Sequence, residues 1–236
     1  MRSYSNTKVI NRNKKIGQYT SIGAFAILGL GFYITIKLPE QITFSFGALL
    51  LGFFLSQLGM YFTNRWGRTP RPDQLIEQGL KGLGREYTIY HYLAPAAHLL
   101  VGPAGVWAIL PYQQAGTIRY EKNRWKLRGG GAIQNYMRFF GGEGIGRPDL
   151  DAASEIETMQ RFFQRKLPEG QPAPEIQAAL LFVHPKVELQ ANDSPLPAMK
   201  PKEFKEFIKN LAREETIPAL SLETIRSVLP APQQDV

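Results

Sequence analysis

Two long apolar stretches dominate the first third of the chain. Residues 16–36 and residues 41–64 contain no charged side chain. Each is as long as the roughly 20 residues that a helix needs to cross the hydrocarbon core of a bilayer. The connection Lys37–Glu40 contains Pro39, which favours a tight turn. The pattern predicts a transmembrane helical hairpin with helices at about 16–37 and 41–64.

Two other interpretations of these stretches fit the pattern less well. A secretory signal peptide would end in a small-residue cleavage pattern, whereas here a second apolar stretch follows at once. A pair of buried core helices in a soluble domain would not need two uninterrupted spans of this length with basic flanks. Five glycines are compatible with close helix packing, but they form no GxxxG motif: Gly23, Gly29, Gly31, Gly47 and Gly52.

The pattern after residue 72 alternates between helix and strand. Asp73 can cap a helix that runs to about Leu83, and a second apolar stripe predicts a helix over 149–167. The continuously apolar segment 177–183 is typical of a strand buried on both faces. Further strands are expected at 88–93, 98–101, 106–112, 117–121 and 124–127, with a turn at Lys122-Asn123, and further helices at 202–213 and 222–228. The glycine-rich residues 129–148 are expected to form a loop.

This order of elements predicts an α/β fold in which a layered, mixed-sheet domain follows the helical hairpin. The expected divisions are a basic N-terminal segment, the hairpin, a basic linker with two prolines, the α/β domain, and a C-terminal tail with a short helix. Their bounds are 1–15, 16–64, 65–72, 73–215 and 216–236.

The positive charge is concentrated on both sides of the hairpin. The chain of 236 residues has 28 Lys and Arg against 20 Asp and Glu. Residues 1–20 hold five basic and no acidic side chains, residues 64–72 hold three and none, and the remainder beyond 72 is balanced. The positive-inside rule then predicts both termini in the cytoplasm of a bacterium, with the hairpin in its inner (plasma) membrane. The residues expected at anionic headgroups are Lys14, Lys15, Arg65, Arg68 and Arg71.

Several classes of chemistry find no support in the composition. The chain has no Cys and only three His, which excludes thiol nucleophiles and Cys-ligated metal centres. The glycine-rich run at 141–146 lacks the Lys-Ser/Thr of a P-loop, and no G-x-S-x-G or H-E-x-x-H motif is present. No cofactor is therefore expected. Nucleic acid is an unlikely partner, because the domain beyond residue 72 has no net charge.

A family resemblance emerges in the middle of the chain. The segment His98–Tyr112, HLLVGPAGVWAILPY, followed by Gly116-Thr-Ile118 and Trp125, resembles the NERD (nuclease-related) domain. The resemblance covers roughly residues 73–212. NERD domains are similar to PD-(D/E)xK nucleases, so the resemblance implies a mixed sheet flanked by helices in three layers.

The positions that carry catalysis in this family are changed here. The resemblance places the family's Asp, Glu and Lys at Ala97, Leu110 and Tyr112. None of these residues can supply a carboxylate for Mg²⁺ or a cationic side chain. His98 matches the motif's own histidine, and Glu77 loosely matches a family acid. From their positions alone, Glu77 is expected on a solvated helix face, and His91 and His98 as hydrogen-bonded strand residues.

Three functions are compatible with this sequence. The first is a catalytically degenerate, membrane-anchored domain that acts as a binding or scaffold module, with Leu110 and Trp107 packed or facing a partner. The second is an active metal-dependent nuclease with relocated carboxylates, such as Glu86 or Glu121. The third is an accessory subunit of a membrane complex, with other membrane-associated chains around the hairpin. The first and third make the lipid bilayer and neighbouring protein chains the expected partners.

Overall fold

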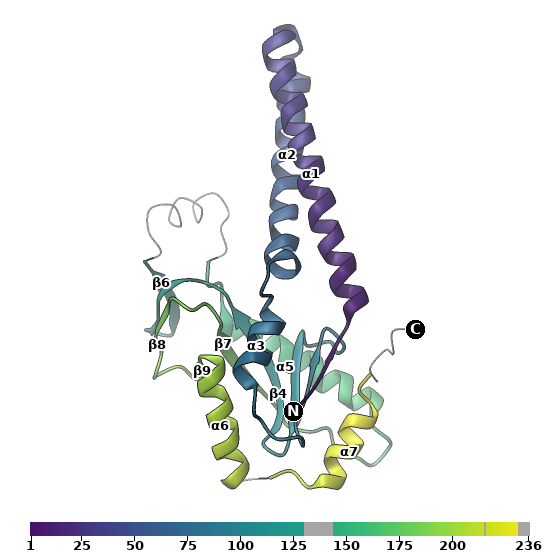
Figure 1. Ribbon diagram of the computed structural model, residues 1–236, viewed down its shortest axis with the longest axis vertical. Coiled ribbons are helices and arrows are strands. Elements are labelled where there is room, and N and C mark those ends of the chain that lie inside the picture. The colour runs from purple at the N-terminus through teal and green to yellow at the C-terminus, as the bar shows by residue number, and fades with distance from the viewer. Residues whose placement is uncertain (130–143, 215, 231–236) are drawn as a thin grey trace. The chain divides into compact units, whose positions relative to one another are not determined.

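The computed structural model describes residues 1–129, 144–214 and 216–230. It separates into two compact units, a helical unit over Thr7–Arg71 and a sheet unit formed by Met1–Asn6 with Pro72–Val236 (Figure 1). Most of the predicted glycine-rich loop, residues 130–143, lies outside the described residues. The protein is mixed α/β, with two long apolar helices near the N-terminus and a mixed sheet.

The helical unit is the predicted hairpin. Helix α1 (Thr7–Lys37) and helix α2 (Ile42–Phe62) lie side by side, joined by the short 3₁₀ turn η1 (Pro39–Gln41) (Figure 1). Helix α1 begins nine residues before the predicted start, because the mostly polar residues 7–15, which include four Lys and Arg, continue the helix beyond the apolar stretch. A π-helical turn, η2 (Thr63–Gly67), follows α2, so Arg65 belongs to this turn rather than to the linker.

A seam of small residues holds the two helices together. The buried positions recur every seven residues on each helix, a spacing that keeps one face toward the partner helix. The small residues among them are Gly17, Ala24 and Gly31 on α1, and Ser45, Gly52 and Gly59 on α2. Ile10, also buried on α1, follows the same spacing, and buried Asn13 does not. A Cβ atom at Gly52 would lie 2.6 Å from Leu28 Cγ, and one at Gly59 would lie 2.5 Å from Ser21 Oγ. Close approach of the helices therefore requires glycine at both positions.

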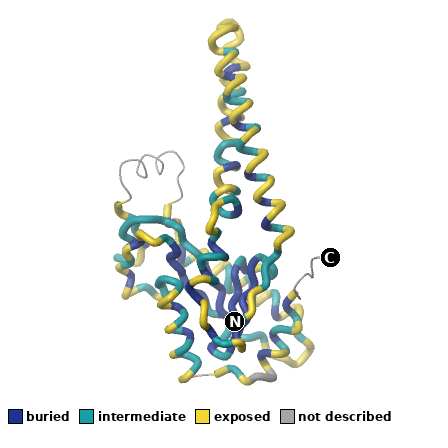
Figure 2. The backbone as a smooth tube through the Cα atoms, in the orientation of Figure 1, coloured by how far each residue is buried: buried dark blue, intermediate teal, exposed yellow. Residues whose placement is uncertain are grey.

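The outer surface of the hairpin is apolar. Large side chains such as Phe25, Phe44 and Phe54 are exposed, with 76%, 72% and 64% of their surface accessible. Along the hairpin, exposed and intermediate residues outnumber buried ones (Figure 2). In the most apolar 18-residue windows only 11% and 17% of the residues are buried. A core helix of a soluble protein would be mostly buried. Two candidate membrane-spanning helices are thus present, consistent with membrane anchoring.

The sheet unit contains two sheets. Its strands are β1 (Arg2–Ser5), β2 (Thr88–His91), β3 (His98–Gly102), β4 (Gly105–Tyr112), β5 (Gly116–Glu121), β6 (Arg124–Arg128), β7 (Ile176–Phe182), β8 (Val187–Gln190) and β9 (Ala198–Met199). Six of them form a sheet in the order β1-β2-β3-β4-β7-β9, and the other three form a smaller sheet in the order β6-β5-β8. Its helices are α3 (Pro72–Leu80), α5 (Pro148–Lys166), α6 (Pro201–Glu214) and α7 (Ala219–Ser227).

The N-terminal segment and the C-terminal tail differ from the expected divisions. Residues 1–15 are not a separate segment, because Arg2–Ser5 pairs in parallel with β2 and the rest begins α1. Residues 216–230 are not a tail either, since Leu222, Ile225 and Leu229 of α7 and the turn after it are buried in the core of the sheet unit. Both segments are short, so their sequences alone do not indicate that they join the sheet unit.

The core divides between the two faces of the six-stranded sheet. Strand β4 contributes Ala108 and Leu110 to one face, together with residues of α5 and α7. It contributes Trp107 and Ile109 to the other, together with residues of α3 and α6. Strand β7 lies between β4 and β9 and is buried along almost its whole length, as its apolar sequence predicted. The turn at 122–123 is also confirmed, with φ of 52° and 56° at its two residues.

Candidate functional site

The three positions that the resemblance matches to the family's catalytic residues all lie in the sheet unit, with Ala97 just before β3 and Leu110 and Tyr112 on β4. The β3–β4 pairing runs from Leu99 opposite Ala108 to Gly102 opposite Gly105, so Ala97 lies outside the paired part of the hairpin. Ala97 is half-buried just before β3, and its carbonyl accepts a hydrogen bond from the Tyr92 amide at 2.7 Å. Leu110 is 7% exposed and belongs to the core that includes Met159 of α5. Apolar packing therefore surrounds Leu110, the position where the resemblance places the family's Glu.

Tyr112 completes this packing at the end of β4. Its ring stacks on Phe182 with centroids 5.5 Å apart, and its hydroxyl donates to Asp151 Oδ2 on α5 at 3.2 Å. Burial, and secondarily the negative charge of Asp151, raises the pKa of Tyr112 above its ordinary value. The phenol is therefore neutral at physiological pH and acts as a hydrogen-bond donor toward α5.

Trp107 is packed as expected, but on the opposite face of the sheet from Leu110. Its ring is 2% exposed and meets Phe204 and Phe207 of α6 edge-on, at 5.7 and 5.6 Å. Its indole Nε1 donates to the Ala104 carbonyl at 2.9 Å. The prediction that Leu110 and Trp107 are packed, rather than lining a polar cleft, is confirmed.

A chain of polar side chains crosses three strands and α3 near the β1 edge. His91 and His98 face each other across β2 and β3, with their Nδ1 atoms 2.7 Å apart, so one nitrogen donates and the other accepts. The Nε2 atom of His91 lies 3.3 Å from Glu77 Oε1 on α3, within ion-pair range but without hydrogen-bond geometry. The Ser3 hydroxyl on β1 donates to the same Glu77 oxygen.

The expectation for the two histidines is confirmed, and that for Glu77 is only half right. Glu77 is 36% exposed, yet it contacts both Ser3 and His91. Sequence reasoning missed the link to Ser3, because nothing in residues 2–5 predicts a strand. The seven-residue separation of His91 and His98 around a tight connection was the available signal for their pairing.

The relocated carboxylates that an active nuclease would need do not converge. Glu86 precedes β2 in the larger sheet, where its carbonyl accepts a hydrogen bond from Arg226. Glu121 ends β5 in the smaller sheet, 3.2 Å from Lys126 Nζ and 3.7 Å from Arg119 Nη1. Within residues 1–129, 144–214 and 216–230, no group of three or more His, Cys, Asp or Glu could hold a metal ion.

The basic residues expected at the membrane surface lie at the open end of the hairpin. Lys14 and Lys15 are exposed on α1, and Arg68 is exposed after η2. Arg65 lies over the Trp66 ring, with its guanidinium carbon 5.2 Å from the ring centroid. Arg71 is half-buried at the end of the unit. Cation–π contact and nearby aromatic rings suit an interfacial position, and headgroup binding by these five residues stays a prediction.

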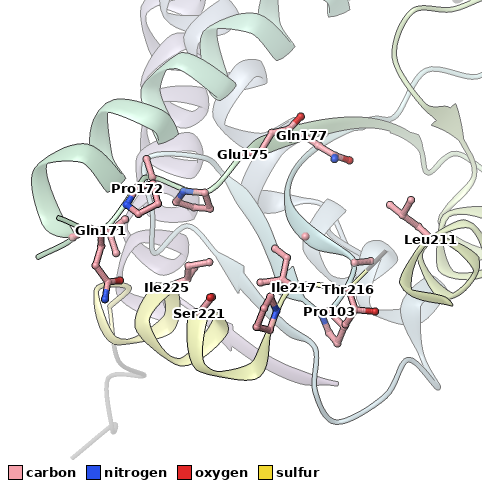
Figure 3. A pocket seen from close by; sticks show the side chains of 16 residues that line it. Pro103, Gln171, Pro172, Glu175, Gln177, Leu211, Thr216, Ile217, Ser221 and Ile225 are labelled. Atoms are coloured by element: carbon pink, nitrogen blue, oxygen red, sulfur yellow. The ribbon is translucent and has the colours of Figure 1, made fainter. Parts of the chain in front are cut away.

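A cavity of about 420 Å³ opens at the other end of β4 (Figure 3). Three connections line it: the β3–β4 turn, the segment between α5 and β7, and the segment between α6 and α7. Pro103, Ile217 and Ile225 supply apolar surface, while Gln177 and Ser221 supply polar groups. Because β4 is eight residues long, Gly105 at the cavity and Tyr112 are roughly 20 Å apart. The cavity is therefore separate from the nuclease-like positions.

Comparison of the chain with protein-family models, with curated proteins and with solved structures finds no match. The resemblance to the NERD domain rests on the quoted residues alone.

Proposed function

We propose that the chain is a membrane-anchored binding or scaffold module built on a nuclease-like, three-layer domain whose catalytic positions are degenerate. Its partners are the lipid bilayer and other membrane-associated protein chains, and it serves as an accessory subunit of a membrane complex. The hairpin lies in the inner membrane of a bacterium, with both termini in the cytoplasm.

One observation carries the non-catalytic part of the proposal. Leu110 and Tyr112 are packed against Phe182 and α5, at the positions where the resemblance calls for a carboxylate and a lysine. Phosphodiester cleavage by a metal-dependent nuclease needs oxygen ligands that position the ion. An apolar strand pair offers no such ligands and disfavours a hydrated cation.

The pairing of β1 supports the proposed topology. Strand β1 precedes the hairpin in the chain and β2 follows it, yet the two are neighbours in one sheet. Two strands of one sheet lie on the same side of a membrane, so the hairpin between them crosses twice. The basic residues at its open end then favour the cytoplasmic side for the sheet domain.

The binding role is supported by the cavity beside α7. It has the size of small-ligand and side-chain pockets, and it combines proline and aliphatic walls with amide and hydroxyl groups. Ser221 projects from α7 at its rim (Figure 3). A side chain inserted by a partner chain can be held there without any catalytic group.

The first readout of the test is nucleic-acid cleavage. The full chain, purified in mild detergent, is incubated with DNA and RNA in the presence of Mg²⁺ or Mn²⁺. We expect no cleavage above that of buffer, and we expect Ala97→Asp/Leu110→Glu/Tyr112→Lys to be the combination needed to restore a metal site. Metal-dependent cleavage by the unmodified protein, lost in Glu86→Gln or Glu121→Gln, would establish the nuclease instead.

The second readout uses the same detergent preparation and identifies the chains that remain bound to it. Ser221→Trp fills the cavity from α7, whereas Ser227→Trp places the same ring on an exposed position of the same helix. We expect a stoichiometric partner chain to be lost from the first variant and retained by the second. If both variants retain the partner chain equally, the cavity does not bind that partner.

A further inference from the structure

The smaller sheet has one charged face and one apolar face. Along β5 and β6 charged and apolar side chains alternate, and the strand register aligns like with like. Arg119 lies opposite Lys126 and Glu121 opposite Arg124, whereas Ile118 lies opposite Leu127. We call the charged side the basic face; its members on β5, β6 and β8 are Thr117, Arg119, Glu121, Arg124, Lys126, Arg128, Glu188 and Gln190.

The basic face points away from the core. Ile118, Trp125 and Val187, whose side chains leave the strands on the other side, are 0%, 9% and 2% exposed and belong to the core. Because side chains alternate across a strand, the basic face is directed to solvent. Arg124 and Arg128 are exposed, and Arg119 and Lys126 keep 34% and 40% of their side-chain surface accessible.

The charge on this face is a local excess. It carries four cations and two carboxylates, and exposed Lys122 in the β5–β6 turn adds a fifth cation, whereas residues 73–236 as a whole carry no net charge. Glu121 is held between Lys126 and Arg119. That arrangement leaves Lys122 and Arg124 at the turn of the β5–β6 hairpin, and Arg128 at its open end, as exposed cations that can interact with an external anion.

The composition of the face also limits the kind of anion. None of its eight members is aromatic. Proteins that bind single-stranded nucleic acid on a sheet stack bases on exposed aromatic rings, which supply much of the affinity. A flat face of guanidinium and ammonium groups without such rings suits phosphate oxygens presented by a surface.

We propose that the basic face binds the anionic phospholipid headgroups of the membrane in which the hairpin is anchored. The inference rests on the proposed membrane anchorage. A single residue, Asn6, joins β1 to α1, and four residues, Arg68–Arg71, join η2 to α3. Connections this short hold the domain at a high effective concentration near the bilayer, so a few surface charges are sufficient for docking.

The test uses the full chain in nanodiscs of phosphatidylcholine alone or of equimolar phosphatidylcholine and phosphatidylglycerol. Because the chain has no Cys, one fluorophore can be attached at Gln190→Cys on the basic face, or at exposed Gln164→Cys on α5 as the reference. We expect aqueous iodide to quench the Gln190 label several-fold less in the anionic discs. High salt should restore the quenching, and the Gln164 label should be unaffected by lipid charge.

The matched variants remove equal charge from different places. Arg124→Gln/Lys126→Gln/Arg128→Gln removes three cations from the face, and Arg161→Gln/Arg165→Gln/Lys166→Gln removes three exposed cations from α5. Each cation should contribute about fivefold to the equilibrium constant for docking on the anionic bilayer. The β6 variant should therefore lower this constant on the order of a hundredfold, and the α5 variant should leave it unchanged.

Three results would overturn the inference. The Gln190 label would be quenched equally in both kinds of disc, or both triple variants would behave alike. The third result is that an oligonucleotide protects the label from iodide in neutral discs, whereas anionic discs alone give no protection. That result would assign the face to nucleic acid. A chain that does not co-elute with lipid would refute the anchorage itself, and with it this inference.

Discussion

Tyr112 stands at the position where the resemblance places the family's Lys, and the contacts of its side chain are structural. In place of a cation that would stabilise developing charge, it presents a ring to Phe182 and a hydroxyl to Asp151. These contacts tie the end of β4 to the first turns of α5. Leu110, two residues earlier on the same face, extends the same packing.

The protonation of Tyr112 gives a pH-dependent prediction. Its pKa is raised in the folded protein, so the folded state holds the phenolic proton more tightly than the unfolded state does. The stabilisation is complete below the ordinary value of about 10 and is lost as pH rises above it. Tyr112→Phe should therefore lower the free energy of unfolding by about 1 kcal/mol at pH 7. Between neutral and alkaline pH, the free energy of unfolding should also fall less in Tyr112→Phe than in the wild type.

Denaturant unfolding of the full chain in detergent, from neutral to alkaline pH, measures this effect. Tyr120→Phe is the control, because Tyr120 is also half-buried and packs on Trp125. Tyr87 and Tyr90, whose pKa values are also raised chiefly by burial, contribute to the alkaline dependence that Tyr112→Phe retains. An identical alkaline decline in wild type and Tyr112→Phe would contradict the assigned environment of the phenol.

At the scale of elements, long periodic segments were predictable, whereas three of the short strands were not. The hairpin helices, α5 and β7 carry apolar patterns over many residues, so their type and approximate bounds follow from sequence. Strands β1, β8 and β9 have four, four and two residues, too few to show a period. Their pairing depends on backbone hydrogen bonds to distant strands, which leave no local signal.

The candidate site divides in the same way. That Ala97, Leu110 and Tyr112 supply no carboxylate and no cationic side chain was evident from the sequence. That Leu110 and Trp107 face opposite sides of the sheet follows from strand alternation. The side chains that pack on Leu110 and Trp107, by contrast, come from α5 and α6 respectively. No residue of β4 specifies where these two helices lie. The basic face was also missed, since averaging charge over residues 73–236 conceals a local excess.

The hairpin seam gives a prediction at this scale. Gly59→Ala would place a Cβ atom 2.5 Å from Ser21 Oγ and 3.0 Å from the Ser21 amide nitrogen, whereas a Cβ atom at Gly47 meets nothing within 4 Å. Overpacking of this kind costs about 1–3 kcal/mol. Gly59→Ala should therefore lower the thermal unfolding temperature of the hairpin in detergent, measured by helical circular dichroism.

Gly47→Ala is the matched control on the same helix. Since alanine favours helix over glycine, it should leave the hairpin unchanged or slightly more stable. Equal destabilisation by the two substitutions would show that the seam is not the contact between the helices.

For the whole molecule, the order of elements along the chain constrains the topology. Strand β1 comes before the two-helix hairpin, and all the other strands come after it. Strand β1 nevertheless belongs to the same six-stranded sheet as β2. Strand β1 can pair only after residues 88–91 have been made, so the N-terminus must stay on the side where the domain folds. Eight basic residues on the two flanks of the hairpin favour that retention: Arg2, Lys8, Arg12, Lys14, Lys15, Arg65, Arg68 and Arg71.

The most direct test of the central claim is the accessibility of single cysteines to a membrane-impermeant maleimide in bacterial spheroplasts. Glu40→Cys lies in the turn of the hairpin and Gln164→Cys lies on α5, both at exposed positions in a chain without other cysteines. The account predicts labelling of Glu40→Cys in intact spheroplasts, and labelling of Gln164→Cys only after the membrane is permeabilised. Protection of Glu40→Cys together with labelling of Gln164→Cys in intact spheroplasts would contradict the account, as would release of the protein from membranes by alkaline carbonate.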